Sequence, residues 1–171
     1  MKKKEFIIIH GLNGSPKGHW QDFLYEDLKE LGENVFFPQF SNNNNPNLNL
    51  WLEQLHKLEK HINENTVGIF YVKSHHSVQK GMLSLEKTIE IGKKYNIPVV
   101  VDAAAEEDLE KYVLMGTDMV IYSGSKAIEG PASGFITGKK DLIKNCKLQY
   151  KGIGRAMKVD KGVIMSLLSA L

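Results

Sequence analysis

The chain has 171 residues, of which 42% are hydrophobic and 25% are charged. This composition is typical of one globular domain with a real hydrophobic core, and it excludes a disordered chain or a fibre. The formal net charge is only +2, and the lysines are spread over several predicted helices, so charge gives no reason to expect a nucleic-acid partner.

Cysteine content and the N-terminus indicate the compartment. The one cysteine, Cys146, excludes an internal disulfide and cannot by itself form a zinc site, so we expect a reducing compartment and no metal centre. Cys146 lies in a helical pattern, where we expect a small core residue. Behind the charged N-terminus, the apolar run Phe6-Ile-Ile-Ile9 is too short for a signal peptide or a membrane span. We therefore expect a cytoplasmic protein without a membrane partner.

The first part of the chain predicts alternating strands and helices. Residues 5–9 form a β-branched run typical of a strand, and the glycines and proline behind them require a tight turn. Apolar residues at i, i+3 and i+4 spacing predict a helix over 17–31, which Gly32 ends. A short strand at 34–37 and an amphipathic helix over 48–62 follow. This βαβα order is how an open parallel sheet begins.

The rest of the chain continues the pattern and then changes it. Strands are predicted at 67–72, 98–101 and 119–122, with helices over 83–95 and 109–116 between them. Each helical segment is long enough for a parallel crossover. Residues 133–137 predict one antiparallel strand because the connection is tight, and helices over 139–149 and 158–171 close the sequence. We predict an α/β fold: a three-layer, mostly parallel open sheet with helices on both faces.

Two reactive side chains follow neighbouring apolar strands. Asp102 ends the run from Pro98, and Lys126 follows the run from Met119. Because buried parallel strands present chemistry at their carboxyl ends, we expect the carboxylate and the amine at one edge of the sheet. Pyridoxal phosphate (PLP) requires this pair, since an anion faces its ring nitrogen and an amine reacts with its aldehyde.

The flanking residues suit the same cofactor. Ala104, between two further alanines, leaves room for a flat ring, and the hydroxyls of Ser123 and Ser125 can bind a phosphate near the lysine. Ordinary roles stay open for both principal residues. Asp102 can cap a helix that contains Glu106 and Glu107, and a lysine among glycine and serine is often a solvated loop residue.

One resemblance concerns residues 4–66. It is carried by the string from Phe6 to Trp20, which includes His-Gly, Gly-Ser-Pro and Gly-His-Trp, and by later matches that end at Thr66. This segment resembles the start of the small serine hydrolases related to retinoblastoma-binding protein 9, which are α/β-hydrolases. The resemblance implies that the Leu12 N–H contributes to an oxyanion hole. No Gly-x-Ser-x-Gly occurs anywhere, and the adjacent Ser74 and His75 point to opposite faces of an extended segment, so we do not expect hydrolase activity.

A second resemblance concerns residues 67–171. Its motifs are Tyr71–Met82, Val99–Leu109, Tyr122–Pro131 and Gly154–Val159. They are similar to those of fold-type I PLP enzymes of the D-glucosaminate-6-phosphate ammonia-lyase and selenocysteine synthase group. The resemblance implies the following roles: Lys126 as Schiff-base lysine and general base, Asp102 as partner of the pyridine nitrogen, Ser123 and Ser125 as cofactor-side hydroxyls, His75 and His76 as substrate-side histidines, and Arg155 as an anion contact.

Our interpretation is a chimera joined near Thr66, with a hydrolase-like βαβα segment over 1–66 and a PLP-transferase-like segment over 67–171 in one continuous sheet. A complete PLP enzyme of this kind also has a glycine-rich phosphate turn before such a segment and a small domain after it. We therefore expect a truncated PLP-fold domain, resembling a lyase or transferase for amino-sugar phosphates or amino acids, with little or no turnover. A hydrolase-like domain without its nucleophile and a purely structural module are the alternatives. We expect a small-molecule substrate or no partner at all. The sequence leaves open whether the chain forms a homodimer.

Overall fold

The structure is a computed structural model that describes residues 4–8, 20–37, 47, 49–50, 53, 59–73 and 84–171. The chain forms two compact units, Met1–Val99 and Val100–Leu171. Its six described strands are mostly parallel, with one antiparallel pair and helices between them. The predicted α/β fold class is confirmed. The predicted helix over 48–62 and the ends of the first strand and helix lie largely outside the described residues.

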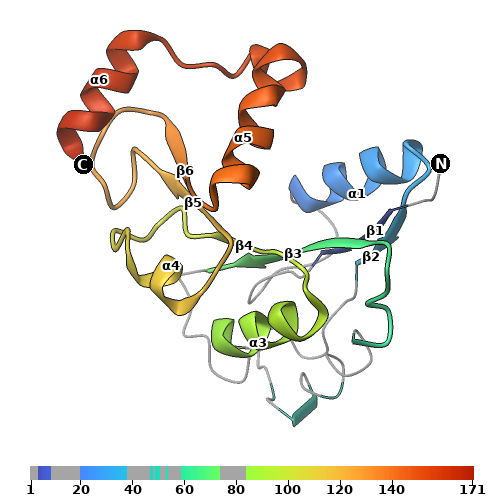
Figure 1. Ribbon diagram of the computed structural model, residues 1–171. Helices are drawn as coiled ribbons and strands as arrows, with labels where there is room; N and C mark the ends of the chain where they lie inside the picture. Colours follow the sequence, from blue (N-terminus) through green and yellow to red (C-terminus); the bar gives the residue numbers. More distant parts are fainter. Residues whose placement is uncertain are drawn as a thin grey trace. The chain divides into compact units, whose positions relative to one another are not determined.

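The first unit is a parallel three-stranded arrangement with helices on both sides. Its strands have the order β2-β1-β3, and α1 and α3 lie on opposite sides of them (Figure 1). The elements are β1 (Glu5–Ile8), α1 (Trp20–Glu30), β2 (Asn34–Phe36), β3 (Thr66–Val72) and α3 (Leu85–Tyr95). Each agrees with a predicted element to within a few residues at its described ends.

Helix α3 shows why the local sequence adopts this structure. The Ser84 side chain caps the helix by accepting a hydrogen bond from the Lys87 N–H at 3.2 Å. Asn96 ends the helix in the left-handed conformation, with φ of 54°. Between these caps, Ile89 and Gly92 belong to the buried face. The helix therefore has a start, a stop and a core face that the sequence encodes directly.

The second unit contains the antiparallel pair. Its strands have the order β4-β5-β6, with β4 and β5 parallel and β5 and β6 antiparallel. The elements are β4 (Val99–Asp102, whose first residue closes the first unit), α4 (Lys111–Met115), β5 (Met119–Ser123), β6 (Gly134–Gly138), α5 (Lys140–Leu148) and α6 (Lys161–Ala170). The predicted antiparallel strand is confirmed. Two short 3₁₀ helices, η1 (Gln149–Lys151) and η2 (Ile153–Arg155), separate α5 from α6.

The core of the second unit consists of β-branched and tyrosine side chains. Val101, Val120, Tyr112 and Tyr122 are each at most 1% exposed. Cys146 is only half-buried, with its Sγ 3.6 Å from Met119 Sδ, so it lies at the border of this core. Burial is thus concentrated around β4 and β5, the two strands that carry the predicted site.

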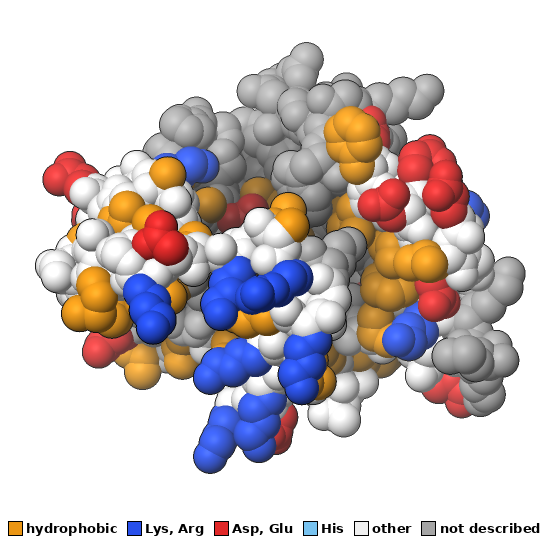
Figure 2. All heavy atoms as spheres, turned by 90° about the horizontal axis from the view of Figure 1, so that it is seen from above, with side chains coloured by type: hydrophobic (Ala, Val, Ile, Leu, Met, Phe, Trp, Pro, Cys, Tyr) orange, Lys and Arg blue, Asp and Glu red, His pale blue; other side chains and the backbone are white. Residues whose placement is uncertain are grey.

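Basic side chains gather in one area of the surface in Figure 2. In the second unit, the exposed basic residues from the start of α5 to the start of α6 are Lys139, Lys140, Lys144, Lys147, Lys151, Arg155, Lys158 and Lys161. Among the described residues, two of these form ion pairs: Lys139 with Asp118 at 2.5 Å and Lys144 with Asp141 at 3.4 Å. The lysines of this unit are therefore more concentrated than their spread along the whole sequence indicates. In the part of the chain that is described, no helix is long and apolar enough to span a membrane.

We expect Gly92→Ala to destabilise the first unit. A Cβ at this position would lie 2.4 Å from Val99 Cγ2 and 2.9 Å from the Ile97 carbonyl oxygen, neither of which can move freely. The overpacking should cost about 1–3 kcal/mol in the free energy of unfolding, measured by urea denaturation. Gly68→Ala is the matched control, because its nearest neighbour, the Pro98 carbonyl oxygen, lies at an ordinary 3.5 Å. Equal stabilities of the two variants would contradict the packing described for α3.

Candidate functional site

The carboxyl ends of β4 and β5 lie side by side. In their parallel register Asp102 is opposite Ile121. The pairing continues beyond the strand, because the Ala103 N–H donates to the Ile121 carbonyl at 2.9 Å and the Ser123 N–H donates to the Ala104 carbonyl at 3.3 Å. The backbone from Asp102 to Ala104 is therefore held against the end of β5, where Ser123 lies.

The register also assigns side chains to faces. Residues opposite one another in a ladder share a face, and successive residues alternate between faces. Asp102, Ile121 and Ser123 therefore belong to one face, whereas Val101 and Tyr122 belong to the other. Asp102 and Ser123 are both half-buried. A carboxylate and a hydroxyl thus share one face at one edge of the sheet.

Asp102 is held by its own turn. Its Oδ1 accepts a hydrogen bond from the Ala104 N–H at 3.1 Å, which is an Asx turn. Residues 103–110 contain no helix, and α4 begins only at Lys111. The alternative in which Asp102 caps a helix containing Glu106 and Glu107 is therefore wrong. Among the described residues, Asp102 has no further side-chain hydrogen bond.

A closed loop follows β5 and carries the lysine. The Gly124 N–H donates to the Ser133 carbonyl at 2.8 Å, and the Gly130 N–H donates to the Gly124 carbonyl at 2.7 Å. Ser125 and Lys126 are exposed on this loop, and the hydroxyl oxygens of Ser123 and Ser125 are 3.4 Å apart. The Lys126 amine has no hydrogen bond or ion pair to any described residue. The loop therefore presents two hydroxyls and an amine directly after the site face.

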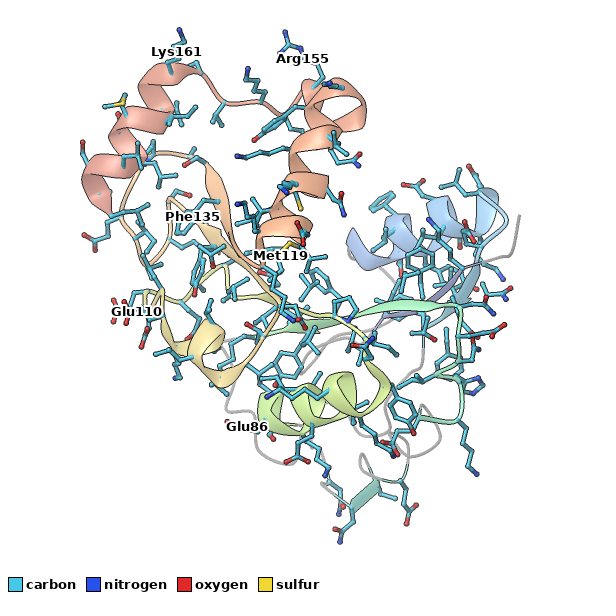
Figure 3. The ribbon with its side chains drawn as sticks, in the orientation of Figure 1. Glu86, Glu110, Met119, Phe135, Arg155 and Lys161 are labelled. Atoms are coloured by element: carbon cyan, nitrogen blue, oxygen red, sulfur yellow. The ribbon has the colours of Figure 1, made fainter. Side chains whose placement is uncertain are left out.

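The structure does not bring all of the predicted site residues together. Asp102, Ala104, Ser123 and Ser125 are connected by the backbone and side-chain bonds given above, and Lys126 follows them in the loop. Arg155 is exposed in η2, and its guanidinium points outward in Figure 3. The predicted residues Leu12, Ser74, His75 and His76 lie outside the described residues. No three His, Cys, Asp or Glu side chains of the described ranges form a group that could bind a metal ion.

Two buried tyrosines support the segment behind Asp102 and were not predicted as site residues. The Tyr112 hydroxyl donates to Glu106 Oε2 at 2.5 Å, and the Tyr122 hydroxyl donates to the Asp108 carbonyl at 3.0 Å. Burial raises the pKa of both tyrosines, and the hydrogen bond to Glu106 raises the pKa of Tyr112 further. The sequence does contain a signal, because a tyrosine on an apolar helix face needs a partner for its hydroxyl.

Comparison with known proteins identifies the family. The model of the family described as SelA, L-seryl-tRNA selenium transferase, matches residues 53–171. The chain belongs to this family. A second family model, described as serine hydrolase, matches residues 6–82, less than half of the chain. Both resemblances found in the sequence are thus supported, and the two matches overlap over residues 53–82. A chimera remains our interpretation of the two matches.

Individual relatives of this SelA-family chain are much longer than it is. The chain is 54% identical over 115 residues to D-glucosaminate-6-phosphate ammonia lyase of Salmonella typhimurium, which is 67% of this chain and 31% of that protein. It is 32% identical over 133 residues to L-seryl-tRNA(Sec) selenium transferase of Mannheimia succiniciproducens, which is 68% of this chain and 28% of that protein. The chain thus spans about a third of the length of these curated relatives.

The structural similarity extends further along the chain than the sequence match. A solved structure of D-glucosaminate-6-phosphate ammonia-lyase matches with a TM-score of 0.75 and 39% sequence identity. The match covers 98% of this chain and 42% of that one. The N-terminal part therefore has counterparts in the lyase structure, although the sequence match with the Salmonella protein covers only 67% of the chain.

We expect Gly124→Ala to displace the loop that carries Lys126. A Cβ at this position would lie 2.4 Å from Ser133 Oγ, 2.9 Å from the Pro131 carbonyl oxygen and 3.0 Å from Leu167 Cδ1. The clash should lower the free energy of unfolding by about 1–3 kcal/mol in urea denaturation. Gly162→Ala, whose nearest neighbour is the exposed Asp160 carboxylate at 3.1 Å, should change it by less than half as much. The reverse order would show that the loop is not closed as described.

Proposed function

We propose that this chain binds PLP at the edge formed by the carboxyl ends of β4 and β5. The observation that carries the proposal is the ladder register, with the Ser123 N–H bonded to the Ala104 carbonyl at 3.3 Å. It puts the Asp102 carboxylate and the Ser123 hydroxyl on one face, with the loop of Lys126 directly after Ser123. Membership of the SelA family, and 54% identity to an ammonia lyase over 115 residues, support the proposal independently.

The described side chains fit the chemical groups of PLP. The second oxygen of Asp102 would accept a hydrogen bond from the protonated ring nitrogen, and half-buried Ala104 leaves space for the ring beside it. The hydroxyls of Ser123 and Ser125, 3.4 Å apart, would donate to phosphate oxygens. The Lys126 amine would hold the aldehyde carbon. When bound, PLP supplies an electron sink for bonds at the carbon that carries the substrate amine.

We infer a lyase- or transferase-type domain for amino-sugar phosphates or amino acids, with little or no turnover. Lys126 Nζ would move the proton at the carbon next to the substrate amine, as a general base. Its exposure argues for slow chemistry, because water surrounds an amine that should work in a site from which water is excluded. His75, His76 and Arg155 would bind the anionic groups of a small-molecule substrate. A homodimer, and the absence of nucleic-acid and membrane partners, stay predictions from the sequence.

Reductive trapping tests the cofactor proposal. We expect the chain to develop an absorption band at the edge of the visible range when PLP is added, and borohydride to fix the cofactor mainly on the peptide that contains Lys126. Lys126→Ala should lose both the band and the label, because Lys126 is the lysine among the described residues of the loop that directly follows Ser123. Lys140→Ala is the matched control, since Lys140 is an exposed lysine of the same unit at the start of α5. Peptide mass mapping measures the label.

A band that survives Lys126→Ala, or a label spread evenly over many lysines, would contradict a specific site. Such a result would show only that PLP reacts with exposed amines in general. The exposed lysines of the α5 surface make this comparison necessary, because they offer many alternative amines to a free aldehyde.

The serine hydrolase match over residues 6–82 suggests a second candidate activity, which is hydrolysis by a nucleophilic serine. The sequence contains no Gly-x-Ser-x-Gly turn that would present a nucleophilic serine. We therefore expect a fluorophosphonate probe to leave every serine of the folded chain unlabelled, as measured by intact mass. Stoichiometric labelling of one serine, abolished by heat denaturation, would establish a hydrolase-type nucleophile and overturn this expectation.

A further inference from the structure

The segment between Asp102 and α4 is ordered without regular secondary structure. Residues 103–110 contain only turns, although three alanines and two glutamates favour a helix. At its start, the Ala104 N–H bonds to Asp102 Oδ1 at 3.1 Å and the Glu106 N–H bonds to the Ala103 carbonyl at 3.0 Å. These two local bonds form a compact turn that contains the proposed partner of the PLP ring nitrogen. Something else must hold this turn in place against the helical alternative.

Two tyrosine hydroxyls contact the segment from the core. The Tyr112 hydroxyl donates to Glu106 Oε2 at 2.5 Å, and the Tyr122 hydroxyl donates to the Asp108 carbonyl at 3.0 Å. Both tyrosines are 1% exposed, so their rings are fixed by packing. Tyr122 also stacks on Phe135, with ring centroids 5.1 Å apart, which ties it to the neighbouring strand β6. The contacts therefore connect a rigid core to the middle of the segment, at Glu106 and Asp108.

The strength of the contact at Glu106 follows from its chemistry. A hydroxyl that donates to a carboxylate forms a stronger hydrogen bond than a neutral pair, especially near a buried region. Burial and this bond raise the pKa of Tyr112, so the hydroxyl remains a donor at neutral and mildly alkaline pH. Removing the hydroxyl would leave the half-buried Glu106 carboxylate without this partner. The turn would then lose the side-chain bond that fixes its end.

We propose that Tyr112 and Glu106 are a positioning pair for Asp102. The hydrogen bond between them fixes the turn of residues 103–106 and thereby holds the Asp102 carboxylate where it would meet the PLP ring nitrogen. Neither residue would itself touch the cofactor. This inference rests on the proposed function for its effect on PLP, while its effect on the turn is independent of PLP.

Substitutions that remove or conserve the bond test the pair. Tyr112→Phe and Glu106→Ala should each weaken PLP binding about tenfold, the loss expected for one charge-assisted hydrogen bond. Glu106→Gln, which keeps an acceptor oxygen at the same reach, should stay close to the original chain. Tyr150→Phe is the matched control, because Tyr150 is 48% exposed and its hydroxyl has no hydrogen bond to a described residue. Each variant is titrated with PLP by absorption, and its folding is checked by thermal denaturation.

Two further readouts separate positioning from stability. The pH midpoint at which the ring nitrogen of bound PLP loses its proton, followed by nitrogen NMR of isotope-labelled cofactor, should fall in Tyr112→Phe and Glu106→Ala, since a displaced Asp102 no longer keeps that nitrogen protonated. The double variant should lose little beyond either single variant, because both remove the same bond. An unchanged midpoint and unchanged affinity in both single variants would overturn the positioning role. Glu106→Ala also decides the question if Tyr112→Phe does not fold.

Hydrogen exchange of the PLP-free chain makes the test independent of the proposed function. Backbone amides of residues 103–106 should exchange faster in Tyr112→Phe and Glu106→Ala than in the original chain and in Tyr150→Phe. Unchanged exchange would overturn the pair whatever PLP does. If the original chain binds no PLP but exchange in the variants rises, the proposed function fails and the structural role of the pair stands.

Discussion

The parallel pairing of β4 and β5 is the interaction on which the candidate site depends. It extends past the last residue of β4 through the hydrogen bond from the Ser123 N–H to the Ala104 carbonyl. This bond and the bond from the Ala103 N–H to the Ile121 carbonyl keep the residues after Asp102 beside the end of β5, so the carboxylate shares an edge with the hydroxyl of Ser123. The chemistry that we propose requires that these two strand ends stay in register.

The two faces of this pair of strands differ in polarity and in burial. One face presents the half-buried polar groups of Asp102 and Ser123, and the other buries Val101, Val120 and Tyr122. The segment behind Asp102 is held by two buried tyrosines, Tyr122 of this buried face and Tyr112 of α4, whose hydroxyls donate to the Asp108 carbonyl and to Glu106. The carboxylate of such a site is held in position by buried residues that a ligand would not contact.

Much of this arrangement could be predicted from the sequence, since apolar runs specify strands and the residues at their ends specify the edge. Asp102, Ser123 and the antiparallel strand β6 were predicted in this way. The segment after Asp102 was not, because Ala-Ala-Ala-Glu-Glu has a strong local preference for helix. Hydrogen bonds from Tyr112 and Tyr122, 6 and 14 residues after their partners Glu106 and Asp108, override that preference. For Tyr112 the sequence predicted only a place in the helix over 109–116, since hydropathy patterns do not show where a hydroxyl finds its partner.

A crystal structure of the chain soaked with PLP tests the central claim most directly. The account predicts a cofactor at the carboxyl edge of β4 and β5, with its ring nitrogen in hydrogen-bond reach of Asp102, its phosphate at Ser123 and Ser125, and continuous density to Lys126 Nζ. A cofactor bound at another surface lysine, or Asp102 and Ser123 on opposite faces of the sheet, would contradict it.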